Sequence, residues 1–452
     1  MVVPILVHMR LAWRVAALAL AVSGLSLAAE SEPWEVYRER RETLARKNSG
    51  GIILLFGYGA REAQDVRSPF RQESNFYYLT GWNEPGAGLL LLPRNESHET
   101  YGEILFLPAR NVSEENWNGS RVSPDDPEIV GRTGFSDVRD VERLSSAVSR
   151  ALEDYDSVRS LLPGKLGFAD QQPPDRTERL EELAKGHSVG DVRPTIAAMR
   201  AVKTEGEIRL IERAIGATIA AHRAAWQKIC PGIHEYQVSG LMIGKMLELG
   251  CSRVAYAPIV GSGPRALTLH YVANSGRLES GELVLMDVGG EYGQYAADLT
   301  RTVPVNGRFT ARQKELYEIV LGAEKAAIAA VRPGMTLAGQ GPNSLYEVAL
   351  DYLDSHGKDK GGNSLGQYLR HSIGHYVGLG VHDPGSPHNA LKPGMVIAIE
   401  CGLYIPEEKI GIRIEDMVLV TKQGGRVLSQ ALPRGVEEIE EIMARGGRSS
   451  SE

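Results

Sequence analysis

The sequence predicts an α+β protein of two domains, a smaller α/β domain followed by a larger one dominated by strands. The length of 452 residues exceeds that of one ordinary domain. In the first part of the chain, short apolar runs alternate with helix-like segments, as in a layered α/β domain. In the second part, neighbouring apolar runs joined by turn residues predict strand pairs.

The first domain is expected to span residues 30–195. Apolar runs bounded by glycine or proline predict its strands, and a Gly-Trp-Asn-Glu-Pro-Gly turn separates two of them. The predicted strands are residues 51–57, 75–79, 88–92 and 101–107, and helices are expected at 34–47 and 138–155. A polar, proline-containing break at 171–176, followed by Pro194, places the domain boundary between residues 195 and 196.

The second domain is expected to span residues 196–445 and to begin with two helices. Residues 203–228 open with Thr204-Glu-Gly-Glu, a capping-box pattern, and residues 234–249 end before Gly250, a helix-stop residue. Strands then dominate. Further helices are predicted at 311–331 and 344–355, and residues 446–452 are expected to form a disordered tail.

The composition is that of a globular protein, with 42% apolar and 24% charged residues. The net charge is −7, and no stretch interleaves basic with aromatic residues, so no nucleic-acid partner is expected. The odd number of cysteines implies no disulfide framework; they are Cys230, Cys251 and Cys401.

Residues 1–29 have the order of an export signal. Arg10 and Arg14 precede an apolar run at 15–27, and Ser26-Leu27-Ala28 is a suitable cleavage site. The run is short for a bilayer span. We therefore expect a periplasmic or secreted protein without stable membrane association after cleavage; the alternatives are an uncleaved anchor and an incorrect start.

Five residues of metal-binding types stand in short apolar segments of the last third of the chain. A buried carboxylate must be paired, hydrogen-bonded or bound to a cation. Four carboxylates and one imidazole that converge could hold two divalent metals, which would make the protein a hydrolase. The five candidates are Asp287, Asp298, His375, Glu400 and Glu415.

Strand parity shows how these carboxylates could meet. A hairpin turn at residues 291–294 can bring Asp287 and Asp298 together. The segments around Glu400 and Glu415 look like adjacent strands, and Arg413 shares a face with Glu415. Two carboxylates this close raise each other's pKa unless a cation intervenes.

Ligand type limits the metal. Carboxylates with one imidazole favour Mn²⁺, Co²⁺ or Zn²⁺. Two such ions can share a bridging water, lower its pKa and clamp a tetrahedral intermediate. His371 and His375 have the spacing of a zinc helix, but the glutamate of that motif is replaced by Ser372. Histidines that bind no metal, among them His270 and His382, can contact substrate or move protons.

Each candidate alone also has an ordinary explanation. Asp287 could be a turn residue, Asp298 could pair with Arg301, and Glu415 could pair with Arg413 on an exposed sheet face. The histidines could be core or loop residues. The order in which the candidates occur together favours a site.

Six segments in this order resemble the metallopeptidase family that contains aminopeptidase P, prolidase and methionine aminopeptidase. Residues 70–85 also resemble the aminopeptidase P N-terminal domain, so the resemblance covers about residues 34–445. The six segments are Asp287-Val-Gly, Ala297-Asp298-Leu-Thr-Arg-Thr, Gly374-His375-Tyr-Val-Gly, Val381-His382-Asp383, Ile399-Glu400 with Gly402-Leu-Tyr, and Gly411-Ile-Arg-Ile-Glu415-Asp.

The resemblance implies a pita-bread fold, with a curved, mainly antiparallel sheet covered by helices, and a site for two divalent ions, with Mn²⁺ expected. Asp287 and Asp298 would bind one ion, and His375 and Glu400 the other. Asp298 and Glu415 would bridge the two.

It further implies that His270 and His382 contact the substrate and stabilise the transition state. His371 would line the pocket, and Arg413 would orient Glu415 or Asp298. The implied reaction is hydrolysis of the bond between an N-terminal residue and a following proline. A homo-oligomer, either a dimer or a tetramer, is expected.

The chain departs from the family pattern at three positions, Ser372, Cys401 and Tyr77, where relatives commonly have Gly, Pro and Trp. None of them removes a ligand. Two other functions stay open: a prolidase that cleaves only Xaa-Pro dipeptides, and a non-catalytic binding module on the same fold. Retention of all five ligands argues against the module, because function follows the site rather than the fold.

Overall fold

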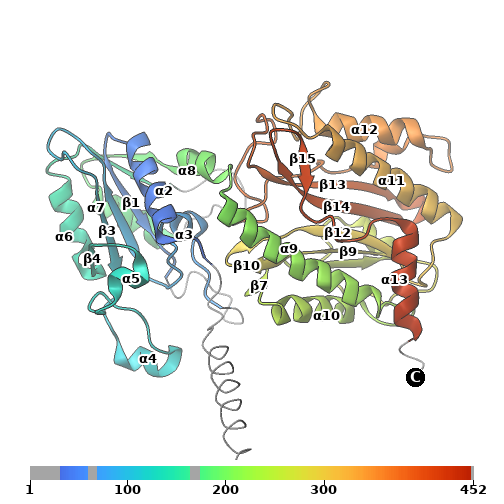
Figure 1. The fold of residues 1–452 in the computed structure, drawn as a ribbon, viewed down its shortest axis with the longest axis horizontal. Helices are drawn as coiled ribbons and strands as arrows, with labels where there is room; N and C mark the ends of the chain where they lie inside the picture. The colour runs from blue at the N-terminus through green and yellow to red at the C-terminus, as the bar shows by residue number, and fades with distance from the viewer. Residues whose placement is uncertain (1–30, 60–68, 163–173, 449–452) are drawn as a thin grey trace, which may run out of the picture.

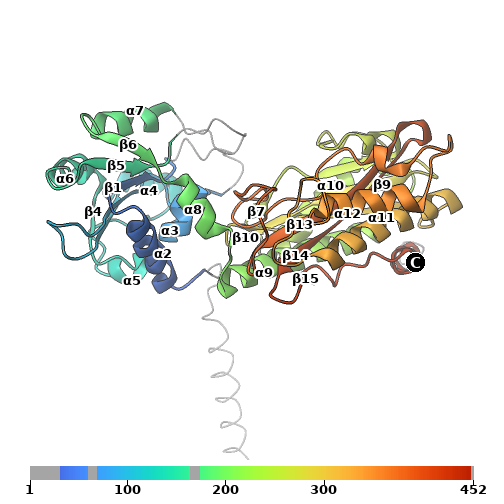
Figure 2. The ribbon, with the colours of Figure 1, turned by 90° about the horizontal axis from the view of Figure 1, so that it is seen from above.

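The computed structural model describes residues 31–59, 69–162 and 174–448. The predicted export signal lies outside these residues. Two domains lie side by side in both ribbon views, with helix α8 (Arg193–Arg200) between them (Figures 1 and 2). This helix runs across the predicted boundary at 195/196.

The N-terminal domain is built on a six-stranded mixed sheet of order β4-β3-β2-β1-β5-β6. β2 is antiparallel to β1 and β3, whereas β5 is parallel to β1 and β6, and β4 is parallel to β3. The strands are β1 (Ile52–Phe56), β2 (Gly88–Leu92), β3 (Gly102–Leu107), β4 (Val138–Asp140), β5 (Ser157–Ser160) and β6 (Ser188–Asp191).

Both faces of this sheet are covered, which explains why β1 is apolar throughout. Ile53 and Leu55 join the cluster that contains residues of α2 and α3, whereas Ile52 and Leu54 join the one that contains residues of α6 and α7. The helices of this domain are α2 (Trp34–Lys47), α3 (Ser74–Thr80), α4 (Val112–Asn118), α5 (Ile129–Thr133), α6 (Leu144–Ala151) and α7 (Pro174–Leu183).

Two predicted elements of this domain differ in the structure, and strands β5 and β6 and helices α4, α5 and α7 have no counterpart in the prediction. Residues 75–79 form helix α3 rather than a strand: the Glu73 side chain accepts a hydrogen bond from the amide of Phe76, and Gly81 ends the helix at φ 67°. The periodicity of a short, fully buried apolar segment does not tell a helix from a strand. The predicted helix at 138–155 begins only after strand β4, where the Asp140 side chain accepts from the amide of Glu142.

The helices predicted for the second domain are confirmed. Thr204 forms the expected capping box at the start of α9, and Gly250 follows α10 with a φ of 92°. Helix α13 continues to Arg448, so it enters the predicted tail, whose residues 449–452 lie outside the described part of the chain. The helices are α9 (Glu205–Trp226), α10 (Glu235–Glu248), α11 (Ala311–Ala330), α12 (Leu345–His356) and α13 (Val436–Arg448).

The strands of this domain pair antiparallel in three small sheets, of order β12-β9-β8, β13-β14-β15 and β11-β10-β7. β12 and β14 contact each other across sheets. The strands are β7 (Arg253–Val254), β8 (Ile259–Ser262), β9 (Leu283–Val288), β10 (Gly290–Tyr292), β11 (Tyr295–Ala296), β12 (Leu299–Pro304), β13 (Val396–Ile405), β14 (Ile410–Val420) and β15 (Gly425–Val427).

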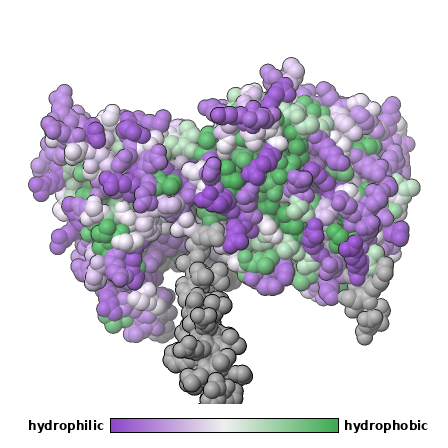
Figure 3. Space-filling model, viewed as in Figure 1, coloured by the Kyte–Doolittle hydropathy of each residue, from purple (hydrophilic) through white to green (hydrophobic). Residues whose placement is uncertain are grey.

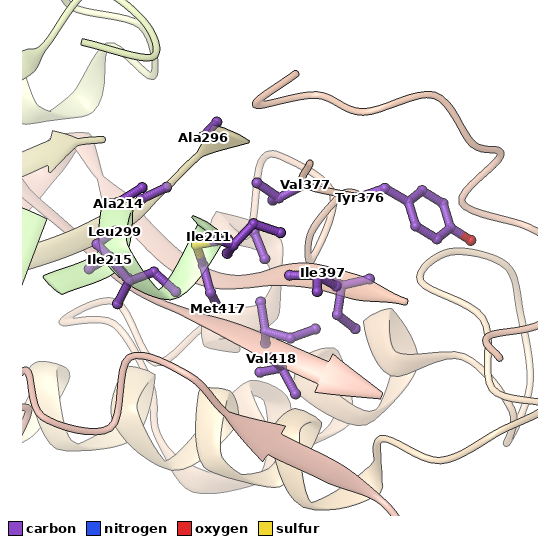
Figure 4. Close-up of a cluster of buried hydrophobic side chains, with 14 of the residues drawn as sticks. Ile211, Ala214, Ile215, Ala296, Leu299, Tyr376, Val377, Ile397, Met417 and Val418 are labelled. Carbon is purple, nitrogen blue, oxygen red and sulfur yellow. The ribbon is translucent and has the colours of Figure 1, made fainter. Parts of the chain in front are cut away.

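The core of this domain lies between α9 and the strands. Ile211 and Ile215 of α9 lie beside Leu299 of β12 and Met417 of β14, and all four are buried (Figure 4). In β12, Thr300 and Thr302 face away from Leu299, because successive side chains of a strand alternate between faces. In β14, Met417 shares its face with Glu415, and its sulfur accepts from the amide of Asp298, so Met417 lies between this core and the polar residues.

Buried charges next to this core are paired. The guanidinium of Arg301, fully buried, donates to Asp416 at 2.8 Å and to the carbonyl of Glu415 at 2.6 Å. Arg434 reaches the other oxygen of Asp416 at 2.9 Å. Arg301 therefore pairs with Asp416 and not with Asp298, so the simple ion-pair explanation for Asp298 is wrong.

Hydrophilic residues cover most of the face seen in Figure 3, and the apolar ones gather on the second domain near the place of α9 in Figure 1. Among the helices of the described residues, we find none that combines the length and the apolar character needed to cross a bilayer.

We predict that His222 makes the stability of the protein depend on pH. This fully buried histidine of α9 contacts the carbonyl of Leu299 through Nε2 at 3.1 Å, and burial, followed by the charge of Arg301, lowers its pKa from 6.5 to about 3. Between these values the unfolded chain binds a proton that the folded chain does not. The free energy of unfolding should thus fall by about 1.4 kcal/mol per pH unit on acidification.

Denaturant unfolding at pH 6.5, 5.5 and 4.5 checks this, with His222→Gln as the comparison, because glutamine can still donate to Leu299 but does not titrate. The slope with pH should be smaller in the variant. Equal slopes would contradict the prediction.

Candidate metal centre

Paired strands bring the four predicted carboxylates together. Asp287 of β9 lies opposite Thr300 of β12, two residues after Asp298. Glu400 of β13 lies directly opposite Glu415 of β14. The strand pairs predicted from parity are thus confirmed, and all four carboxylates face one site.

Three of the five predicted ligands form a tight group. One ligand atom each of Asp298, His375 and Glu415 lies within 4.8 Å of the others, an arrangement that could hold a metal ion. His375 Nε2 is 3.3 Å from Asp298 Oδ2 and 3.9 Å from Glu400 Oε1, so Glu400 borders the group. Asp287 is linked to this group by the hydroxyl of another side chain, whose role was not predicted from the sequence.

That side chain is Tyr256, which precedes β8. Its hydroxyl donates to Asp287 Oδ1 at 2.6 Å and also contacts Asp298 Oδ1. Burial, then the charges of Asp287 and Asp298, raises its pKa well above the ordinary value, so the phenol keeps its proton. Tyr256 therefore holds two carboxylates side by side. Nothing in its apolar segment signals this role.

Arg413 contacts a different carboxylate from the one implied. Its Nη2 lies 2.6 Å from Asp287 Oδ2, and Nη1 donates to the Tyr404 hydroxyl at 2.7 Å. Within the described residues, its hydrogen bonds include none to the carboxylate of Glu415 or Asp298. Instead, Thr300 accepts from Arg413 Nε at 3.4 Å and donates to Glu415 at 2.8 Å. The cross-strand register explains this, because it puts Thr300 beside Asp287.

The electrostatics of the group suit a cation. Burial raises the pKa of Asp298 to about 6, assisted by the charge of Asp287, although the hydrogen bond with His375 offsets part of the rise. Burial and the charges of Asp298 and Asp287 raise the pKa of Glu415 well above its usual range. Carboxylates that are this hard to ionise together become stable anions when a divalent cation lies between them.

Arg413 and His375 balance part of the negative charge of this group. Burial raises the pKa of Asp287, but the guanidinium of Arg413 and the hydroxyl of Tyr256 prevail and lower it. Burial lowers the pKa of His375, but the hydrogen bond and charge of Asp298 prevail and raise it to about 9. Oxygen-rich donors with one imidazole fit Mn²⁺, Co²⁺ or Zn²⁺.

The other predicted histidines surround this group. The His382 ring packs edge-to-face on His375, with 4.3 Å between centroids. His371 Nε2 is 2.8 Å from the Tyr404 hydroxyl, and its Nδ1 is 3.6 Å from Glu400. His270 and His382 are both exposed.

Two of these histidines are neutral at ordinary pH. Partial burial, followed by the charges of His375 and then His270, lowers the pKa of His382 to about 4. Burial, followed by the charge of Arg413, lowers the pKa of His371 to about 4. Both rings can therefore donate or accept a hydrogen bond without adding charge to the site.

A cleft of about 1180 Å³ lies between the two domains, beside the metal group. Tyr256 and His382 line it from the second domain, and Arg71 and Asn75 line it from the first. A chain longer than two residues could extend into such a space. The site is therefore open on the side of the N-terminal domain.

Comparison with known proteins agrees with this geometry. Residues 209–422 match the model of metallopeptidase family M24, and residues 37–159 match the aminopeptidase P N-terminal domain. A Haemophilus influenzae protein, Xaa-Pro aminopeptidase, is 33% identical over 433 residues, which cover 91% of this chain and 97% of the relative. The chain belongs to metallopeptidase family M24.

Other members of the M24 family extend the comparison. The Xaa-Pro aminopeptidase of Escherichia coli strain K12 is 33% identical over 438 residues, which cover 90% of this chain and 97% of that protein. The structure of E. coli aminopeptidase P with the inhibitor Pro-Leu has a TM-score of 0.81 and 31% identity, covering 93% of this chain and all of the other. A zinc-substituted form with product has a TM-score of 0.78 and 31% identity, covering 92% and 99%.

These similarities confirm the predicted pita-bread architecture with its preceding α/β domain. As a member of the M24 family, the chain is a metal-dependent hydrolase. The specific roles of the individual site residues stay predictions that the geometry permits.

We predict that Asp298→Ala abolishes activity and weakens metal binding while the fold is retained. Asp298 lies at the centre of the group, in contact with His375 and Tyr256. Calorimetric titration with Mn²⁺ should give two bound ions per chain for the wild-type protein. The variant should bind fewer ions or bind them much more weakly. Equal binding in the two proteins would refute the role of Asp298.

Tyr256→Phe should lower metal affinity by about 10- to 100-fold, because an outer partner orients the ligands it contacts. The variant keeps the ring and loses only the hydroxyl that joins Asp287 and Asp298. Tyr292→Phe serves as a control, since this tyrosine is also buried and lies in β10. The dissociation constant for Mn²⁺ checks the prediction, which an unchanged value would contradict.

Proposed function

We propose that this protein is a metal-dependent Xaa-Pro aminopeptidase, which removes an N-terminal residue that is followed by proline. The observation that carries the proposal is the convergence of Asp298, His375 and Glu415 within 4.8 Å, bordered by Glu400 and Asp287. The similarity to Xaa-Pro aminopeptidases along nine-tenths of the chain supports the substrate class.

Two divalent ions would be held by the five predicted ligands, with Asp298 and Glu415 shared between them. Bound there, they would supply Lewis-acid activation of water and of the scissile carbonyl. We propose Mn²⁺ as the native metal. The donor set supports it but suits Co²⁺ and Zn²⁺ as well.

The chain's own residues would orient the reaction. Neutral His382, beside His375 and open to the cleft, can donate a hydrogen bond to the substrate carbonyl, and His270 can act from the segment that follows β8. Arg413 and Tyr256 keep Asp287 ionised and in place. His371, held by Tyr404, would line the pocket.

We also propose that the protein is exported and that it assembles as a dimer or tetramer. The positive, apolar and small-residue order of residues 1–29 supports export. The assembly is carried over from the resemblance to oligomeric relatives.

Prolidase activity is the second candidate, because the same metal centre could cleave Xaa-Pro dipeptides. The cleft beside the metal group is open between the two domains, and His382 lines it, which favours substrates that extend beyond a dipeptide. Peptides of three or more residues are therefore the proposed substrates.

We expect the Mn²⁺-loaded protein to cleave Xaa-Pro-Xaa peptides faster than Gly-Pro. Release of the N-terminal residue, followed by chromatography, measures both rates, and Xaa-Ala-Xaa peptides are the control for the proline requirement. Cleavage of the dipeptide alone would favour prolidase. If the metal-loaded protein cleaves neither substrate, the peptidase proposal is refuted.

A further inference from the structure

The loop that presents His382 is held from the N-terminal domain. Residues 378–384 form this loop, and most of them line the interdomain cleft. Two arginines that precede the second domain's helix α9 in sequence, Arg71 and Arg200, reach across to it. Both ribbon views place α3 and α8 on the side of the first domain that faces β7 and β10 (Figures 1 and 2).

Arg71 makes a forked contact with the second domain. Its Nε donates to Glu291 Oε2 at 2.7 Å, and its Nη2 donates to the backbone carbonyl of Leu379. Within its own domain, its Nη1 donates to Ser74 Oγ at 3.2 Å. The side chain of Glu291 is 5% exposed, whereas that of Arg71 is 21% exposed, so the guanidinium is accessible from the cleft.

The other end of the loop is fixed by Asp383, which directly follows His382. Its carboxylate is 2.5 Å from Arg200 Nη2 and 3.2 Å from Lys203 Nζ, and all three side chains are at most 5% exposed. Arg200 also donates to Asn75 of α3 at 2.7 Å. The loop folds tightly on this carboxylate, which accepts from the amide of Gly380 at 3.1 Å.

We propose that Arg71 is a positioning residue of the active site: by holding Leu379 and Glu291 it fixes the loop that presents His382. The inference rests on the proposed function, in which His382 contacts the substrate. A hydrogen bond from the planar guanidinium to one carbonyl oxygen fixes direction as well as distance. A displacement of about 1 Å at a catalytic group can cost about 100-fold in rate.

The test uses Arg71 rather than Arg200, because the buried Arg200 also joins Asn75 of α3 to Asp383, so its loss would disturb the packing of α8 as well as the loop. Loss of Arg71 removes the ion pair of the buried Glu291, which is destabilising in itself, so the control must also remove the partner of a buried glutamate. Arg312 supplies a matched control. It is 24% exposed, pairs with the buried Glu408 at 2.7 Å and donates to the carbonyl of Lys358, but it lies on α11 and does not line the cleft.

The variants are Arg71→Ala, Arg71→Lys, Arg312→Ala, His382→Ala and the double variant of Arg71 and His382, each loaded with Mn²⁺. With an Xaa-Pro-Xaa peptide, Arg71→Ala should lower kcat by about 10- to 100-fold at unchanged Mn²⁺ content. The kcat of Arg71→Lys should lie between those of Arg71→Ala and the wild type, because one ammonium group cannot reach both Glu291 and Leu379. Guanidinium ion added to Arg71→Ala should restore part of kcat, and Arg312→Ala should retain nearly the wild-type rate. In the His382→Ala background, loss of Arg71 should have no further effect.

Equal effects of Arg71→Ala in the presence and absence of His382 would overturn the proposal, because they would show that Arg71 does not act through this histidine. So would a rate for Arg71→Ala equal to that of Arg312→Ala.

Hydrogen exchange gives a reading that is independent of activity. The amides of residues 378–384 should exchange faster in Arg71→Ala than in Arg312→Ala, and equal exchange would contradict the inference. An inactive wild-type protein would count against the peptidase proposal, whereas the exchange result would still decide whether Arg71 holds the loop.

Discussion

The confinement of four carboxylates in one buried place is the constraint on which the rest of this domain depends. Asp287, Asp298, Glu400 and Glu415 come from two pairs of adjacent strand segments, and burial raises the pKa of the last three. Such a group is costly without cations and well suited to hold them. As a metal-dependent hydrolase of family M24, the protein can use such a group of carboxylates to hold divalent ions.

Several layers of contacts keep the carboxylates in register. Tyr256 and Arg413 each donate a hydrogen bond to one carboxylate oxygen of Asp287, and Thr300 donates one to Glu415. On the other face, Arg301 binds Asp416 and the backbone of Glu415. The alternation of side chains along β14 thus places Glu415 and Arg413 on the side of the site, and Asp416, which pairs with Arg301, on the opposite side.

The N-terminal domain takes part in the site as well as flanking it. It forms one wall of the cleft, and its contacts run to Glu291, to the backbone of Leu379 and, through α8, to Asp383. A histidine on a loop is only as well placed as the loop itself. The two-domain architecture therefore provides both the space for a peptide and a support for His382.

The sequence alone determined the elements with strong local signals. Thr204 and Gly250 mark helix ends by their own chemistry, and the alternation of side chains along paired strands predicted that Asp287 meets Asp298 and that the strands of Glu400 and Glu415 are adjacent. It failed at α3, because a short, fully buried apolar run has no period that separates helix from strand. Three features were decided by the tertiary structure only: the role of Tyr256, the pairing of Arg413 with Asp287, and the contacts of Arg71. These depend on how strands and domains far apart in sequence come together, and local patterns carry no information about that.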